Sequence, residues 1–453
     1  MCRWVAITTL LIVSTAHAVQ DNTDKAACYA GAYRLSDGTE IVLTSAQGNL
    51  RYRLLDGRTG RLAPDSATQF HSVPGWSERE PPVVRAMFAG CSNPAMSFQW
   101  GTAPPLSGAR VTQPVIPIRF SNAGADLYGE LHLPAQHRPR AVVVLQFGGG
   151  RDSAVATNYV QYLLPLRDIA VVIFDKRGTG KSTGNFTIDF TTLADDVVAA
   201  VHRVRSMPEV ANVPLGLMGE SQGGWVVPLA ATKTSVDFVI VSYGLAVSLR
   251  EENRLETLQG LQARGYSAAE QARALEVVAA TDRIMISRFK EDGLDELRRL
   301  RQRYGSEKWY RDLSAPTLTG DYTSALANAS DEEIAAVKAF FDIPYDLEYD
   351  PAPTLRQVTV PMLWILAGKD TEAPSASTDV ILRDLQQHAA PIDIAVFPDA
   401  DHGMIEVEQI AGSQKELDRH SPGYFDLLID WSTRRTLGNA TFGTAVLTPR
   451  QKP

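Results

Sequence analysis

Six short, continuously apolar runs constrain the fold of this chain more than any other feature of its sequence. They occupy residues 141–147, 169–175, 213–219, 238–244, 361–368 and 392–398 and read AVVVLQF, IAVVIFD, VPLGLMG, FVIVSYG, PMLWILAG and IDIAVFP. Parallel strands that are covered on both faces show such unbroken apolar runs, whereas half-exposed strands alternate. Helical stretches lie between the runs. Strands that alternate with helices predict a doubly wound, mostly parallel α/β sheet with right-handed crossovers.

Two other regions depart from this pattern. Residues 30–99 form short alternating segments that are broken by turn pairs such as Asp37-Gly38. We expect a small antiparallel β domain at 19–108 and the α/β domain at 109–453, beginning with an antiparallel pair of strands. Residues 246–350 are charged and helical, and they predict a helical insertion between two sheet strands that acts as a lid.

The first 18 residues, MCRWVAITTLLIVSTAHA, have one basic residue, an apolar stretch and a small-x-small end. This layout predicts a secretory signal that is cleaved after Ala18, and hence a periplasmic or secreted protein. A buried helix or a membrane anchor is the alternative, but the apolar stretch is shorter than the roughly 20 residues that a span needs. The remaining cysteines, Cys28 and Cys91, are expected to form one disulfide. Two buried free thiols are the alternative.

Charge and cysteine usage exclude several function classes. The formal net charge is −8, and no run rich in Lys and Arg stands out, which argues against nucleic acid or an anionic membrane as the main partner. The sequence has no CxxC pair or Cys/His cluster, so we expect no metal and no cofactor. The oligomeric state is left open.

The segment GLMGESQGGW places Ser221 between glycines, directly after an apolar run and directly before a helical stretch. A glycine-rich turn is the plain reading. The G-x-S-x-G pattern at a strand–helix junction instead predicts a nucleophile on a strained turn, with the N–H of Gln222 aimed at the oxyanion. Glu220 should point away from the nucleophile, so we expect it to pack or to hydrogen-bond.

A serine hydroxyl needs a general base in order to attack a carbonyl at neutral pH. His402 follows the final apolar run in FPDADHGM, where the carboxyl end of the sheet would place it near Ser221. His388, at a helix end, and His420, in a polar loop, are weaker candidates.

The acid that orients the imidazole should follow an earlier strand. Asp370 does so in LAGKDTEAP, and Glu372 is the second choice. Asp399 and Asp401 are too close to His402 along the chain to reach its outer nitrogen. The resulting order of serine, aspartate and histidine is that of the α/β-hydrolases.

The glycines of FGGGRD, residues 147–152, follow an earlier strand and would bring a second backbone N–H to the oxyanion. We expect Gly149 to supply it, with Gly150 close behind. DKRGTGKS, at 175–182, looks like the end of a phosphate-binding loop, but Asp175 stands where that motif needs glycine. We interpret the segment as a loop that braces the neighbourhood of the nucleophile.

The fragments FDKRGTGKS, GLMGESQGGW, YDPAPTLRQVTVPMLWILAGKD and FPDADHGM carry a family resemblance. Across about residues 114–439 the chain resembles the α/β-hydrolase superfamily, and within it secreted bacterial serine hydrolases near the dienelactone-hydrolase, acyl-thioesterase and prolyl-oligopeptidase branches. The resemblance implies the same roles for the residues singled out above. The chain departs from the family in having Phe147 where a histidine is common before the glycines, which leaves the second oxyanion donor open.

Three kinds of function share this constellation. The leading expectation is a metal-independent serine hydrolase that acts on a small-molecule ester or acyl substrate through an acyl-enzyme. A peptidase or aminoacyl amidase and an acyl thioesterase would use the same residues. A non-catalytic binding module would require the loss of a triad member, and all three are present in the sequence.

Overall fold

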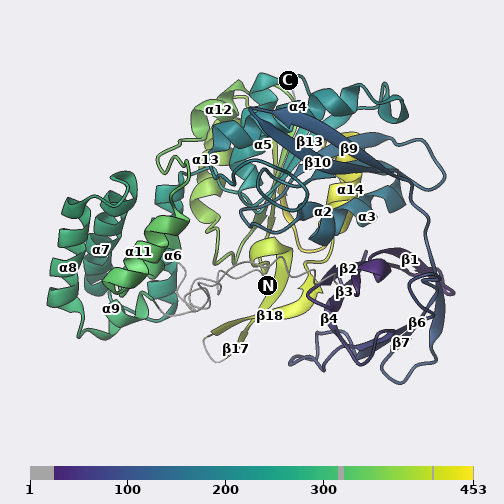
Figure 1. Ribbon diagram of the computed structural model, residues 1–453, viewed down its shortest axis with the longest axis horizontal. Helices are drawn as coiled ribbons and strands as arrows, with labels where there is room; N and C mark the ends of the chain where they lie inside the picture. The colour runs from purple at the N-terminus through teal and green to yellow at the C-terminus, as the bar shows by residue number, and fades with distance from the viewer. Residues whose placement is uncertain (1–24, 315–320, 411–412, 452–453) are drawn as a thin grey trace.

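The computed structural model describes residues 25–314, 321–410 and 413–451 (Figure 1). The predicted signal peptide and its cleavage site lie outside these residues. Three parts make up the described chain: a β-barrel, an α/β domain, and a helical insertion in that domain, called the lid below after its expected role.

The six apolar runs form the parallel strands of a nine-stranded sheet. Its order is β19-β16-β15-β14-β13-β11-β12-β10-β9, with β9, β10 and β19 antiparallel to their neighbours. The expected antiparallel pair at the start of the domain is β9 and β10. The strands are β9 Val115–Asn122, β10 Ala125–His132, β11 Ala141–Gln146, β12 Ile169–Phe174, β13 Leu215–Glu220, β14 Phe238–Ser242, β15 Met362–Ala367, β16 Ile392–Phe397 and β19 Val446–Thr448.

Helices cover both faces of this sheet because each inner strand is apolar on both. Val142 and Val144 face one helical layer, and Val143 and Leu145 face the other. The first layer is α4 Phe190–Arg205, α5 Gly223–Lys233, α12 Ala352–Gln357 and α13 Ala376–Gln387, and the second is α2 Ala154–Thr157, α3 Val160–Leu163 and α14 Tyr424–Arg434. The sequence prediction of a doubly wound α/β sheet is confirmed.

The lid leaves the sheet after β14 and returns before β15. Its helices are α6 Leu249–Ala263, α7 Ala268–Ile286, α8 Glu291–Tyr304, α9 Lys308–Asp312, α10 Asp321–Leu326 and α11 Asp331–Phe340. They enclose an apolar core of their own, which includes Trp309, Tyr310 and Leu326. In Figure 1 the lid and the barrel lie on opposite sides of the hairpin β17–β18 (Ile405–Ile410 and Ser413–His420).

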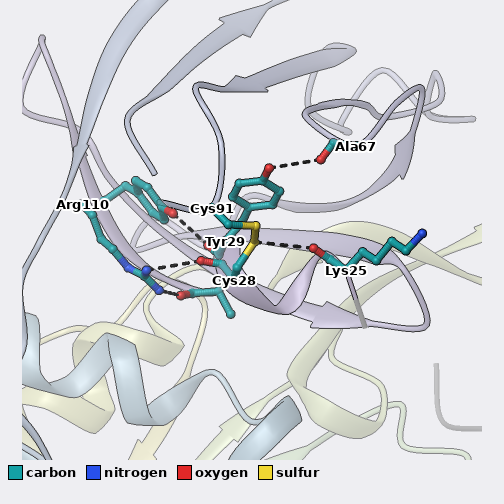
Figure 2. Close-up of a disulfide and its surroundings, with 8 residues drawn as sticks. Lys25, Cys28, Tyr29, Ala67, Cys91 and Arg110 are labelled. Carbon is teal, nitrogen blue, oxygen red and sulfur yellow. Dashed lines mark hydrogen bonds between the residues drawn. A yellow bond between two sulfur atoms is a disulfide. The ribbon is translucent and has the colours of Figure 1, made fainter. Parts of the chain in front are cut away.

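The amino-terminal domain is a closed antiparallel barrel in which β1 pairs with β8. Its strands are β1 Gly31–Leu35, β2 Glu40–Ala46, β3 Asn49–Leu54, β4 Thr59–Pro64, β5 Gln69–His71, β6 Val84–Phe88, β7 Met96–Trp100 and β8 Leu106–Arg110. Because β8 closes the barrel, this domain runs to Arg110 rather than to the expected boundary at 108. Cys28 and Cys91 are joined by a disulfide with a Cα–Cα distance of 5.5 Å, beside the buried Tyr29 (Figure 2).

The hairpin β17–β18 was not expected from the sequence. His420, which we placed in a polar loop, ends β18 and is buried. Its backbone N–H donates to the carbonyl of Gly57 at 2.8 Å, so the hairpin lies directly against the barrel.

The helices within the described ranges are too short or too polar to cross a bilayer.

Candidate active site

Ser221 sits at the turn between β13 and α5 with a φ of 51°, a left-handed conformation that side chains other than glycine rarely adopt. The turn is possible because its neighbours are glycines. A Cβ on Gly219 would lie 2.4 Å from the carbonyl oxygen of Gly223, and one on Gly223 would lie 2.8 Å from the carbonyl oxygen of Gln146. The close approach of strand and helix exposes the hydroxyl at the carboxyl end of the sheet, as a nucleophile elbow requires.

The structure brings Ser221, His402 and Asp370 together, as expected from the sequence. The Oγ of Ser221 is 3.1 Å from Nε2 of His402, and Nδ1 of the same ring is 3.0 Å from Oδ2 of Asp370. Asp370 is 2% exposed, and its Oδ1 accepts hydrogen bonds from the backbone N–H groups of Glu372 and Ala373 at 3.0 and 2.7 Å. A carboxylate fixed in this way holds the imidazole in the tautomer that can accept the serine proton.

Asp401 connects the loop that follows Asp370 to the loop that carries His402. Its Oδ1 accepts hydrogen bonds from the backbone N–H groups of Thr371 and His402, at 2.8 and 2.9 Å. Asp401 was not expected to be the acid, and its carboxylate accepts hydrogen bonds from these backbone groups, whereas the imidazole pairs with Asp370.

Glu372, the second choice for the acid, approaches the other side of the ring. Its Oε2 lies 3.9 Å from Nε2 of His402, the nitrogen that faces Ser221. Burial by itself lowers the pKa of His402, but the carboxylates of Asp370, Glu372 and Asp401 outweigh it and raise this pKa to about 9. The site therefore stabilises the imidazolium that a general base becomes.

The two other candidate bases lie elsewhere. His388 is exposed at the end of α13. His420 stacks on Tyr424, and burial, reinforced by Arg53 and Arg51, holds its pKa well below the usual value.

The glycine loop after β11 lies against the nucleophile. A Cβ on Gly148 would be 3.3 Å from Cβ of Ser221, whereas one on Gly149, the expected donor, would meet nothing within 4 Å. Gln222, the other expected donor, is buried at the start of α5, where backbone N–H groups are not used by the helix. Gly148 was not singled out from the sequence, and the identity of the second donor stays a prediction.

Beneath Ser221 lies a buried polar group of residues that reaches the barrel. Glu220 is 2% exposed, accepts a hydrogen bond from Nδ2 of Asn158 at 2.7 Å, and has its pKa raised to about 7 by burial. Glu220 thus has the hydrogen-bonding role that we expected. Arg53, from strand β3, extends over the ring of Tyr159, with its Cζ 4.3 Å from the centroid.

The segment DKRGTGKS forms a tight loop after β12. Asp175 accepts hydrogen bonds from the hydroxyl of Ser153 at 2.7 Å and from the backbone N–H of Lys181 at 2.9 Å. Arg177 pairs with the buried Asp196 at 2.6 Å. Lys176 was not singled out from the sequence; its Nζ donates hydrogen bonds to the carbonyl of Gly148 and to Oε1 of Gln222, and no spacing in the chain indicates these contacts.

Groups of three or more His, Cys, Asp or Glu side chains arranged to hold a metal ion are absent from the described part of the chain.

Comparisons with known proteins agree with this architecture. Residues 137–292 match the family model described as serine aminopeptidase, S33. Esterase EstD of Thermotoga maritima is 25% identical over 315 residues, which cover 66% of this chain and 62% of the relative. The chain thus spans somewhat less than two thirds of EstD.

Two solved structures are similar at lower identity. The acylaminoacyl peptidase of Pyrococcus horikoshii has a TM-score of 0.43 at 14% identity, covering 89% of this chain and 56% of the peptidase. An esterase of Pyrococcus furiosus has a TM-score of 0.40 at 15% identity, covering 64% of this chain and 83% of the esterase. The strand order, the family match and the similarity to an esterase together show an α/β-hydrolase fold.

Proposed function

We propose that this chain is a serine hydrolase that cleaves carboxylic esters of small molecules through an acyl-enzyme. The observation that carries the proposal is the unbroken path of hydrogen bonds from Ser221 through His402 to Asp370. A fold by itself does not specify an activity, whereas this arrangement has a definite chemical use.

The reaction follows from the geometry. The Oγ of Ser221 bonds to the acyl carbonyl carbon while its proton passes to Nε2 of His402, and the carbonyl electrons move onto oxygen. The N–H groups of Gln222 and of the Gly149 region stabilise that oxyanion. Collapse of the intermediate breaks the bond to the leaving oxygen, which takes the proton from Nε2. Water then attacks the acyl-enzyme by the same steps and regenerates Ser221.

Two observations bear on the substrate class. Similarity to an esterase extends over 66% of the chain, which favours ester substrates. The match to a serine aminopeptidase model over residues 137–292 favours an aminoacyl amide as the second candidate. Both reactions use the same acyl-enzyme, so the leaving group is what a substrate panel has to distinguish.

The proposal is tested by assaying the purified protein on p-nitrophenyl esters of increasing acyl length beside aminoacyl anilides. We expect ester cleavage, and a fluorophosphonate probe should label Ser221. Ser221→Ala should stay folded and lose activity by a factor on the order of 10⁶. Labelling at another residue, or an active Ala variant, would overturn the assignment. Faster anilide than ester cleavage would select the amidase.

We also propose that the protein is exported to an oxidising compartment after cleavage behind Ala18. The disulfide between Cys28 and Cys91 supports this proposal, since such bonds persist outside the cytosol. The intact mass of the exported protein should match a chain that begins at Val19 and is two hydrogens lighter than its reduced form. Two thiols that can be alkylated in the native protein would contradict the disulfide and, with it, the support for an oxidising compartment.

A further inference from the structure

Lys176 is a buried cation next to the nucleophile elbow. It lies just after β12, separated from the end of that strand by Asp175, and only 2% of its surface is exposed. Lysine is seldom buried to this degree without a paired charge. The burial of this lysine therefore needs an explanation, which its hydrogen-bond partners provide.

The ammonium group binds two segments that flank Ser221, the glycine loop and the start of α5. Nζ donates a hydrogen bond to the carbonyl oxygen of Gly148, in the glycine loop, and another to Oε1 of Gln222 at 3.4 Å. It also lies 5.4 Å from the centroid of the Phe186 ring. Among the described residues, the acceptors of its hydrogen bonds are thus a carbonyl and an amide oxygen, not a carboxylate.

Both hydrogen-bonded residues belong to the place where an oxyanion would form. Gly148 is the loop residue packed on Ser221, and Gln222 supplies the first backbone N–H of the expected oxyanion site. Lys176 therefore joins the glycine loop to the start of α5 through hydrogen bonds from one ammonium group, which lies next to both segments.

The positive charge is held there at a cost. Burial, together with the neighbouring cation of Arg151, lowers the pKa of Lys176 to about 7, while the carboxylate of Asp152 opposes them. Negative charge that develops on a nearby substrate oxygen would favour the ammonium form. An apolar side chain of similar length would fill the same space without the penalty of burial, so what the lysine adds at this position is its hydrogen bonds and its charge.

We propose that Lys176 is a positioning residue of the oxyanion site: its ammonium holds the Gly148 loop against α5 and adds positive potential where negative charge develops on the substrate oxygen. The inference rests on the proposed serine-hydrolase function. Preorganised charge in a site that excludes water acts mainly on the transition state, so the effect should fall on kcat rather than on KM.

The test compares Lys176→Met, which keeps the length but removes the charge, and Lys176→Gln, which keeps a donor without the charge. Both should lower kcat on a p-nitrophenyl ester on the order of 10²-fold, the range in which loss of an oxyanion donor falls, with KM nearly unchanged. Lys181→Met is the matched control. Lys181 lies in the same loop, with its Nζ over the Tyr128 ring at 4.5 Å.

A spectroscopic readout separates charge from structural support. An octyl trifluoromethyl ketone forms a bond from its carbonyl carbon to Oγ of Ser221, the serine proton passes to His402, and the ketone oxygen becomes an oxyanion. Fluorine NMR reports the pH at which that oxygen titrates. In both Lys176 variants the pKa of the adduct oxygen should rise above that in the wild type and in Lys181→Met.

The outcomes are distinct. If the proposed function is wrong, the wild type forms no ketone adduct and no fluorophosphonate label at Ser221. If only the role of Lys176 is wrong, all the proteins form adducts whose oxygen has the same pKa, or kcat is unchanged in both variants. A variant that fails to fold is identified by circular dichroism, and the other variant then decides.

Discussion

At the scale of single residues, Asp370 and Glu372 face opposite nitrogens of the His402 ring. Only Asp370 can fix the tautomer, because it bonds Nδ1 and is itself held by two backbone N–H groups. Asp370→Asn should therefore lower kcat by roughly 10³–10⁴, since an amide presents the wrong partner to Nδ1. Glu372→Gln should cost far less. Steady-state kinetics on both folded variants checks this order, and the reverse order would move the acid to Glu372.

The acid limb of the pH–rate profile should depend on Glu372. Neutral His402 is the form that accepts the serine proton, and nearby carboxylates raise its pKa to about 9. In the free enzyme, kcat/KM should thus rise with pH through a value above the ordinary 6.5 of histidine. Glu372→Gln removes one negative charge, lowers that pKa and shifts the limb to lower pH. Profiles of the two proteins that coincide would contradict the electrostatic role of Glu372.

The sequence was sufficient to predict Ser221, His402 and Asp370 as a set because each follows a parallel strand, and the carboxyl ends of such strands meet at one edge of a sheet. It was not sufficient for Lys176 or Gly148. Their places depend on how two loops pack around the elbow, and no spacing in the chain encodes that packing. The approach of Glu372 to Nε2 depends in the same way on the path of one loop.

At the scale of elements, the strands of the large sheet were predictable because their residues are apolar on both faces. The hairpin β17–β18 was not. Its strands, IEVEQI and SQKELDRH, are rich in charged residues. The hairpin contacts the barrel through pairs of polar groups. One such pair is the hydroxyl of Ser77 with Glu408 at 2.8 Å. An interface of this kind leaves no apolar pattern to find.

The side chain of Arg151 connects the glycine loop to the lid. Its Cζ lies over the ring of Phe186, at 4.1 Å from the centroid, and over the ring of Phe340 at the end of α11, at 4.9 Å. Phe340→Ala removes the lid's half of this contact, which is worth about 0.5–1 kcal/mol. We expect the ranking of acyl chain lengths to change several-fold while fluorophosphonate labelling of Ser221 continues.

Ile286→Ala provides the control for this change. Ile286 ends α7 of the lid and is 47% exposed, so its loss should leave the substrate ranking as it is. If Phe340→Ala behaves in the same way, the lid has no part in selecting the acyl group.

At the scale of the whole molecule, the barrel supports the element that follows the base. The hairpin begins at Ile405, directly after the short helix that starts with His402, and Glu406 bridges back to Ala400. From the barrel side, Arg79 pairs with Glu406, whose side chain is 8% exposed, and the indole N–H of Trp76 donates to the carbonyl of Glu416 at 2.8 Å. The amino-terminal domain thus contacts the α/β domain close to the loop that carries His402.

Arg79→Met should disturb the site from a distance. The substitution removes a cation that pairs with the buried carboxylate of Glu406, which should lower the free energy of unfolding by on the order of 1–3 kcal/mol. Because the loop of His402 is attached to this strand, kcat should fall on the order of tenfold through misplacement of the base. Chemical denaturation and steady-state kinetics measure the two effects.

The matched control is Arg34→Met. Arg34 pairs with Glu40 within the barrel and its side chain is 58% exposed. Glu40 keeps a second partner, Arg167, at 2.6 Å, so the loss of Arg34 should change little. Equal kinetics in Arg79→Met and Arg34→Met would mean that the barrel does not influence the base.

Because β1 pairs with β8, every strand of the barrel has hydrogen-bonded neighbours on both sides. Unpaired edges are where a strand from another molecule adds to a sheet, as in aggregates and domain-swapped dimers. The large sheet of the described chain ends at β9 and at β19. Pro117 within β9 lacks an amide hydrogen, and β19 is three residues long, so both edges offer few consecutive hydrogen bonds. The barrel and the large sheet therefore give a second molecule little on which to extend a sheet when the protein is concentrated.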